Sequence, residues 1–134
     1  MNRAADIGLV GHMITGGTLS DSRDALNIAN EREDCFSTCG VHPTRCNEFE
    51  SADDSEAYLE GLKKLIMENE NKILAVGECG IDYERVEQTN PLMQNGLVLV
   101  LLSFFGSSFC TNRRGGIIIF VKWVKIYKWP LKGV

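Results

Sequence analysis

The stretch that most restricts the fold of this chain runs from Ile73 to Tyr83 and reads ILAVGECGIDY. Four apolar residues lead into a glycine, then a single carboxylate at Glu78, and soon a second glycine. A short apolar run of this kind, after a helical pattern, predicts a strand buried on both faces. A glutamate at the end of a buried strand needs a cation beside it, because an unpaired buried charge is costly. Two partners stay open, namely a metal ion and an Arg or Lys from a neighbouring strand.

Strand and helix patterns alternate before this stretch. Strands are expected at 12–15, 35–41 and 73–76, and polar residues predict a loop at 44–54. The first helix is expected to begin at an N-cap formed by Ser20 or Asp21 and to bury a set of apolar residues (Ala25, Leu26, Ile28, Ala29). The second helix, at 55–69, has its apolar residues at helical spacing (Leu59, Leu62, Leu65, Ile66). The order predicts an α/β fold of about three parallel β/α units with right-handed crossovers.

Histidine is rare in this chain, which has only two such residues. His42 ends the second expected strand, directly before Pro43. We therefore expect it on the same edge of the sheet as Glu78, where the chemistry of β/α barrels is found. Two roles stay open for His42, a hydrogen-bonded turn residue and a residue of a substrate or metal pocket. His12 has no motif around it and is expected on the surface.

Two motifs in this order, Gly40-Val41-His42-Pro43 and Val-Gly-Glu-Cys-Gly-Ile-Asp-Tyr at 76–83, resemble those of TatD-type metal-dependent deoxyribonucleases. Residues 13–19 and 21–26 resemble the eukaryotic branch of that family, and the resemblance extends to about Arg85. It implies a partial TIM-type (β/α) barrel, truncated at both ends. It also implies hydrolysis of DNA phosphodiesters with a divalent metal (Mg, Mn or Zn). Five cysteines without a repeating framework, and an opening that does not resemble a secretory signal, predict an intracellular protein with reduced thiols, in nucleus or cytoplasm. Glu78 matches a metal ligand of the family, and His42 matches a pocket residue to which we assign a catalytic role.

The metal site that the resemblance implies needs more ligands than this sequence offers. The family site also uses a His-x-His pair, two later histidines and a late aspartate. Neither His12 nor His42 belongs to such a pair, and no histidine follows Glu78. One carboxylate without imidazoles cannot hold a catalytic cluster tightly. We therefore expect weak or absent metal binding and no nuclease activity from this chain alone.

Charge divides the chain at about residue 91. Residues 1–91 hold all 18 Asp and Glu residues, whereas residues 92–134 hold none. The acidic part shows no strong nucleic-acid-binding patch, since such surfaces are usually basic. We expect a partial β/α domain at 1–91 and an unrelated apolar and basic tail at 92–134, disordered or folded as a hairpin. The apolar run at 97–105 is too short for a transmembrane segment.

Two other interpretations stay open beside the nuclease. In the first, the chain is a non-catalytic truncated isoform that binds a partner or a membrane surface through the basic, aromatic residues 117–132. In the second, it is a mis-spliced product without function. A partial barrel also leaves unpaired strand edges, which favour self-association.

Overall fold

The computed structural model describes Arg3, residues 6–50 and 55–82, the backbone of 116–121, and part of 85–101, as given next. The described residues of that last part are Arg85, Glu87, Gln88, Thr89, Asn90, Leu92, Gln94, Gly96, Leu97, Leu99 and Leu101. The elements in order are β1 (His12–Ile14), α2 (Leu19–Asn30), β2 (Cys35–Cys39), η1 (Pro43–Arg45), α3 (Cys46–Glu50), α4 (Ser55–Glu68), β3 (Ile73–Asp82) and β4 (Gly116–Val121). The strands form one sheet in the order β1-β2-β3-β4.

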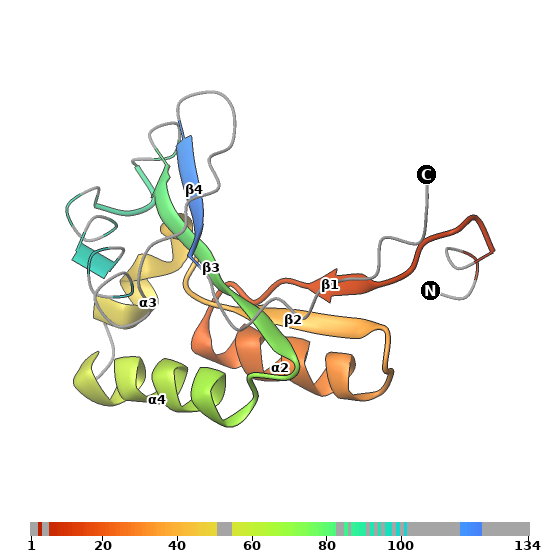
Figure 1. Cartoon of the computed structure of the whole chain (residues 1–134). Helices are drawn as coiled ribbons and strands as arrows, with labels where there is room; N and C mark the ends of the chain where they lie inside the picture. The colour runs from red at the N-terminus through yellow and green to blue at the C-terminus, as the bar shows by residue number, and fades with distance from the viewer. Residues whose placement is uncertain are drawn as a thin grey trace.

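The first three strands are parallel, and α2 and α4 lie on the same side of them (Figure 1). This arrangement confirms the predicted α/β fold with three parallel β/α units. β3 is longer than expected: it continues beyond Val76 to Asp82, so that Glu78 lies within the strand and not after it. The expected loop at 44–54 also contains secondary structure, because η1 and α3 follow His42 directly.

Helix α2 begins two or three residues earlier than the sequence suggested. Thr18 is its N-cap, with extended backbone and a hydroxyl that accepts from the Asp21 amide at 3.0 Å, so the prediction of Ser20 or Asp21 was wrong. Ile28 is 42% exposed, although it was expected in the buried face. Ser22 is buried instead, because its hydroxyl donates to the Thr18 carbonyl at 2.6 Å.

A single apolar cluster fills the space between the sheet and the helices. Helix α4 contributes Leu62 and Ile66, which are buried as expected, whereas Leu59 and Leu65 pack against the cluster from its margin. Strands β2 and β3 contribute thiols and aliphatic side chains, and α2 contributes Leu26. Burial of this apolar surface is the main force that holds α4 against the strands.

Lys72 fixes the opposite end of the sheet, where β3 begins. Its Nζ donates to three backbone carbonyls, of Ala29 at 2.9 Å, Arg32 at 2.6 Å and Cys35 at 3.0 Å. The same Nζ lies 5.6 Å from the centre of the Phe36 ring. One cation thus binds a carbonyl in the last turn of α2, one in the turn that follows and one at the start of β2, and ties all three to β3.

Part of the segment after residue 91 also belongs to this fold. Leu97 and Leu101 have helical backbone and lie in the core cluster, 3% and 2% exposed. If the tail formed the expected hairpin, these residues would lie in its first strand; the structure gives them helical backbone instead. Strand β4 does form, and it pairs antiparallel with β3 from Val76 to Asp82.

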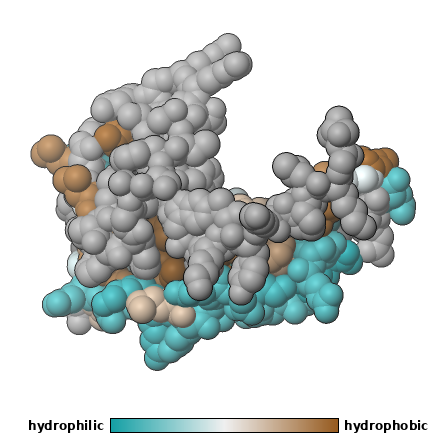
Figure 2. Space-filling view, viewed as in Figure 1, coloured by the Kyte–Doolittle hydropathy of each residue, from teal (hydrophilic) through white to brown (hydrophobic). Residues whose placement is uncertain are grey.

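The described surface is divided by polarity. Figure 2 shows hydrophilic residues over the side formed by α2 and α4, while hydrophobic residues gather at the two ends of the molecule. Exposed apolar side chains near the start of the chain and in the segment after residue 91 agree with this view (Ile7, Leu9, Val10, Met13, Leu92, Leu99). None of the helices in the described part is long and apolar enough to cross a bilayer.

Candidate functional site

Glycines bring the carboxyl ends of β1 and β2 close to each other and to the middle of β3. Gly16 follows β1, and its amide donates to the Thr38 hydroxyl at 3.2 Å. Gly40 follows β2, and its amide donates to the Ser22 hydroxyl at 3.3 Å. A Cβ on Gly40 would lie 2.7 Å from the carbonyl carbon of Gly77 in β3. Only glycine permits this backbone contact, so the ends of β1 and β2 form one rim with Gly77 and Glu78 of β3.

Glu78 lies on this rim, directly after Gly77. Gly77 has a φ of 150°, a backbone conformation that residues with a side chain rarely adopt. The Glu78 side chain is half-buried, and its backbone carbonyl faces Gly40. Among the described residues, no Arg or Lys forms an ion pair with its carboxylate and no hydrogen bond reaches it. A partly buried carboxylate is stabilised by a cation, and the described part of the chain supplies none to Glu78.

His42 follows β2 on the same rim and forms the N-cap of η1. Its backbone amide donates to the Gly17 carbonyl at 2.9 Å, which ties it to the end of β1. The Thr44 amide donates to Nδ1 at 3.2 Å, and the Thr44 hydroxyl lies 2.8 Å from the same nitrogen. Because Nδ1 accepts from an N–H group, the proton of the neutral ring lies on Nε2. His42 therefore forms the expected turn and keeps Nε2 as a donor.

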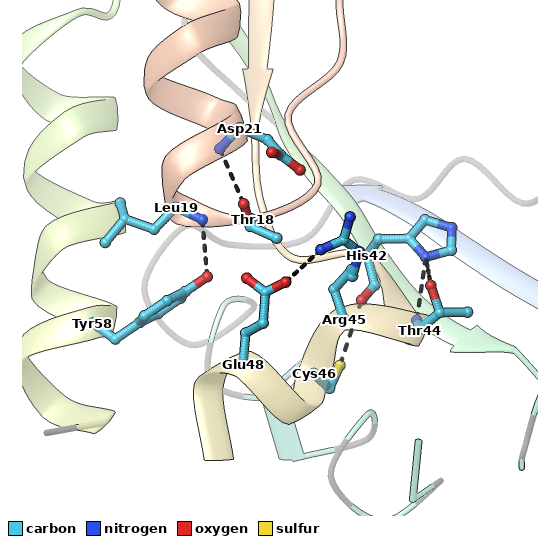
Figure 3. A network of polar contacts seen from close by, with 9 residues as sticks. All are labelled: Thr18, Leu19, Asp21, His42, Thr44, Arg45, Cys46, Glu48 and Tyr58. Carbon is cyan, nitrogen blue, oxygen red and sulfur yellow. Dashed lines mark hydrogen bonds and ion pairs between the residues drawn. The ribbon is translucent and has the colours of Figure 1, made fainter. Parts of the chain in front are cut away.

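A polar network holds this turn in place (Figure 3). Arg45 of η1 forms an ion pair with Glu48 of α3. The Cys46 thiol donates to the His42 carbonyl at 3.7 Å, and burial raises the pKa of this thiol to about 11. Tyr58 of α4 accepts from an amide in the first turn of α2 at 2.9 Å. The loops that follow β1 and β2 are thereby fixed to the helices.

Two buried residues that the sequence analysis missed connect the rim to the segment after β3. The Gln94 side chain accepts from the Asp82 amide at 2.8 Å and donates to the Thr89 hydroxyl at 2.6 Å. Thr89 in turn donates to the Pro43 carbonyl at 2.8 Å. The one signal in the sequence is a polar residue, Gln94, next to an apolar run.

The described residues do not form a complete metal site. They contain no group of three or more His, Cys, Asp or Glu side chains close enough together to hold a metal ion. His12 lies at the start of β1, away from the rim, and its Nε2 is buried without a partner among the described residues. It is half-buried, so the expectation of an exposed His12 was wrong. Glu78 and His42 share the rim without further ligands from the described part.

Comparison with known proteins identifies the family. The model of the family described as TatD related DNase matches residues 1–100, which takes the match beyond residue 91. A 3'-5' ssDNA/RNA exonuclease TatD of Escherichia coli (strain K12) is 35% identical over 82 residues, which cover 61% of this chain and 29% of that protein. A deoxyribonuclease Tat-D of Schizosaccharomyces pombe is 37% identical over 89 residues, covering 64% and 28%.

Solved structures agree with these relatives. A hydrolase of the TatD family from Entamoeba histolytica superposes with a TM-score of 0.67 at 35% identity, over 77% of this chain and 35% of that one. An uncharacterised amidohydrolase from Saccharomyces cerevisiae has the same TM-score at 22% identity, over 76% and 34%, and supports the fold alone. The chain thus spans about a third of the length of the proteins that it matches.

Proposed function

Because the chain belongs to the TatD related DNase family, we propose that it carries part of a hydrolytic site for DNA phosphodiesters. Glu78 is the position of a ligand to a divalent metal (Mg, Mn or Zn), and His42 is a catalytic residue that contacts the substrate. The observation that supports this proposal is the half-buried Glu78 carboxylate on the glycine rim, without a cationic partner in the described part of the chain. Relatives named as deoxyribonuclease and as ssDNA/RNA exonuclease support the choice of substrate.

The two residues have different tasks in this site. A bound divalent metal would supply charge stabilisation and a water of lowered pKa, and a carboxylate such as Glu78 is a suitable ligand for it. His42 donates its Nε2 proton in a hydrogen bond to a phosphate oxygen, since Nδ1 already accepts from Thr44. This bond places the phosphate on the rim beside Glu78.

We further propose that this chain alone does not cleave DNA. The whole sequence contains two histidines, and His12 lies away from the rim. Metal clusters that hydrolyse phosphodiesters hold two ions near each other, which takes several carboxylates and imidazoles. Glu78 with His42 falls short of that number, and Nδ1 of His42 is already engaged by Thr44.

Titration with Mn²⁺, followed by electron paramagnetic resonance, tests the role of Glu78. The unaltered chain should bind Mn²⁺ weakly, and Glu78→Gln should abolish this binding. Glu70→Gln is the matched control, because Glu70 is exposed in the turn before β3, at the opposite end of that strand. Equal Mn²⁺ binding by the unaltered chain and Glu78→Gln would remove Glu78 as a ligand position.

Incubation of the purified chain with single-stranded DNA and Mg²⁺ or Mn²⁺ tests the second proposal. The DNA should remain intact over hours, with a TatD exonuclease as positive control. Metal-dependent cleavage that Glu78→Ala abolishes would disprove the inactivity and support the role of Glu78.

A second candidate function is association through the edge of β1. No described strand pairs with the outer edge of β1, and Val10 and Met13 near it are 67% and 53% exposed. Such an edge accepts a strand from another molecule. Sedimentation should therefore show concentration-dependent association that Met13→Lys weakens and that Met67→Lys, on the exposed face of α4, leaves unchanged. A monomer at all concentrations would contradict this function.

A further inference from the structure

A chain of three hydrogen bonds crosses the interior between the end of β3 and the turn after β2. It runs from the Asp82 amide to Gln94, from Gln94 to Thr89, and from Thr89 to the Pro43 carbonyl. Gln94 is fully buried and Thr89 is 4% exposed. A second bond joins the same segments at the surface, since the Asn47 side chain donates to the Gln88 carbonyl at 2.8 Å.

The groups at the two ends of this series of hydrogen bonds fix the orientation of the Gln94 and Thr89 side chains between them. An amide at Asp82 can only donate, and a carbonyl at Pro43 can only accept. Gln94 must therefore turn its oxygen toward Asp82 and its NH₂ group toward Thr89, whose hydroxyl must point at Pro43. A fully connected buried network of this kind specifies a unique geometry, and loss of one member leaves other buried groups without partners.

The connected positions flank the two proposed site residues. Pro43 follows His42 directly, and Asp82 lies four residues after Glu78 in the same strand. We propose that Gln94 and Thr89 are positioning residues, which set the place of the His42 ring relative to β3. This proposal rests on the proposed function, because it assumes that His42 and Glu78 act on one substrate.

The surroundings of Gln94 favour this role over a general support of the segment. Leu97 and Leu101, three and seven residues later and also with helical backbone, lie in the apolar core cluster. A leucine at position 94 would suit that environment, whereas a buried amide stabilises the fold only if all its partners are in place. The specific use of an amide is explained if the exact place of the Pro43 carbonyl, and so of His42, matters.

Histidine side-chain NMR tests the proposal without metal or nuclease activity. The chain has two histidines, so His12 is an internal reference in the same spectrum. Thr89→Val and Gln94→Leu should shift and broaden the His42 ring signals and reduce the population of its Nε2-protonated form. The His12 signals should stay in place. Thr89→Ser keeps the hydroxyl and should restore the His42 signals. Gln88→Leu should not change them, because the hydrogen bonds given for this exposed residue are made by its backbone amide and carbonyl.

The outcomes separate this proposal from the proposed function. Folded Thr89→Val and Gln94→Leu variants with unchanged His42 signals would overturn it. If neither variant folds, the unaltered chain decides: the side-chain NH₂ of Gln94 should exchange with solvent far more slowly than that of Gln88, and equal exchange would also overturn the proposal. Failure of Glu78→Gln to affect Mn²⁺ binding would instead contradict the proposed metal-ligand role of Glu78, whereas the NMR spectra report only how Gln94 and Thr89 place the His42 ring.

Discussion

The Cα of Gly40 packs directly on the carbonyl oxygen of Glu78, so closely that a Cβ on Gly40 would lie 2.6 Å from that oxygen. This contact joins the end of β2 to the middle of β3, backbone against backbone. It also fixes the distance between the two chain segments that carry His42 and Glu78. Because both contacting groups are backbone, neither can move aside as a flexible side chain would.

Replacement of Gly40 by alanine should therefore destabilise the chain. The added methyl group meets the backbone of Gly77 and Glu78, and overpacking of this kind costs about 2 kcal/mol or more. Urea unfolding followed by circular dichroism measures the change. Gly96→Ala is the matched control: it has helical backbone and nothing within 4 Å of the added group, so it should stabilise by about 0.5–1 kcal/mol. Equal stability of Gly40→Ala and the unaltered chain would contradict the close contact.

Lys72→Met should destabilise the fold at the opposite end of the sheet. The substitution keeps the apolar stem and removes the cation that serves three carbonyls, which we expect to cost about 2–3 kcal/mol. The free energy of unfolding in urea is the measurement. Lys64→Met, which removes only an exposed ion pair with Glu68, should change it by about 0.5 kcal/mol or less. Similar decreases in the free energy of unfolding for both variants would show that the three hydrogen bonds of Lys72 stabilise the fold no more than an exposed ion pair does.

The ion pair between Arg32 and Asp34 should make stability depend on acid pH. Arg32, through its hydrogen bond and its charge, lowers the pKa of Asp34 to about 2. Since the folded pKa lies below the unfolded one near 4, the contribution is present above pH 4 and is lost as the pH falls through 2. Asp34→Asn should thus lower the urea midpoint at pH 6 and have little effect at pH 2. Glu33→Gln, at an exposed neighbour, should not show this pH dependence.

The buried thiols should resist alkylation in the folded chain. Burial raises the pKa of Cys39 and Cys46 to about 11 and that of Cys79 to about 12, and all three side chains are at most 2% exposed. A rise from 9 to 11 alone reduces the reactive thiolate about a hundredfold at pH 8. Iodoacetamide labelling followed by mass spectrometry should find these residues labelled in 8 M urea and protected without it. Rapid labelling of Cys79 in the native chain would contradict the burial of its side chain in the core cluster.

Local patterns in the sequence predicted the three β/α units because a strand and an amphipathic helix each have their own apolar period. The same reasoning ended β3 too early. Gly77 was taken as the end of an apolar run, whereas the strand continues through it with a positive φ and packs on Gly40. Contacts between segments far apart in the chain decide this, and no local period contains them.

The sequence also did not reveal the hydrogen bonds between residues far apart in the chain. The acceptors of Lys72 are backbone carbonyls around residues 29–35, which have no signature in the sequence. Gln94 lies in the part of the chain without carboxylates, and this charge contrast suggested a boundary near residue 91. Charged residues lie mostly on the surface, so a change in charge along the sequence does not tell which apolar residues join the core. Leu97 and Leu101 pack in the core although the residues around them include no carboxylate. The boundary of the domain stays a prediction.

Strand β4 has a consequence for how the sheet can grow. It is paired antiparallel along β3 from Val76 to Asp82, and one side of a strand offers a single row of amides and carbonyls. Only one strand can pair with this edge of β3, so β4 and any further parallel strand would compete for it. A β/α barrel that continued past β3 would therefore have to displace β4 before its next strand could pair with β3.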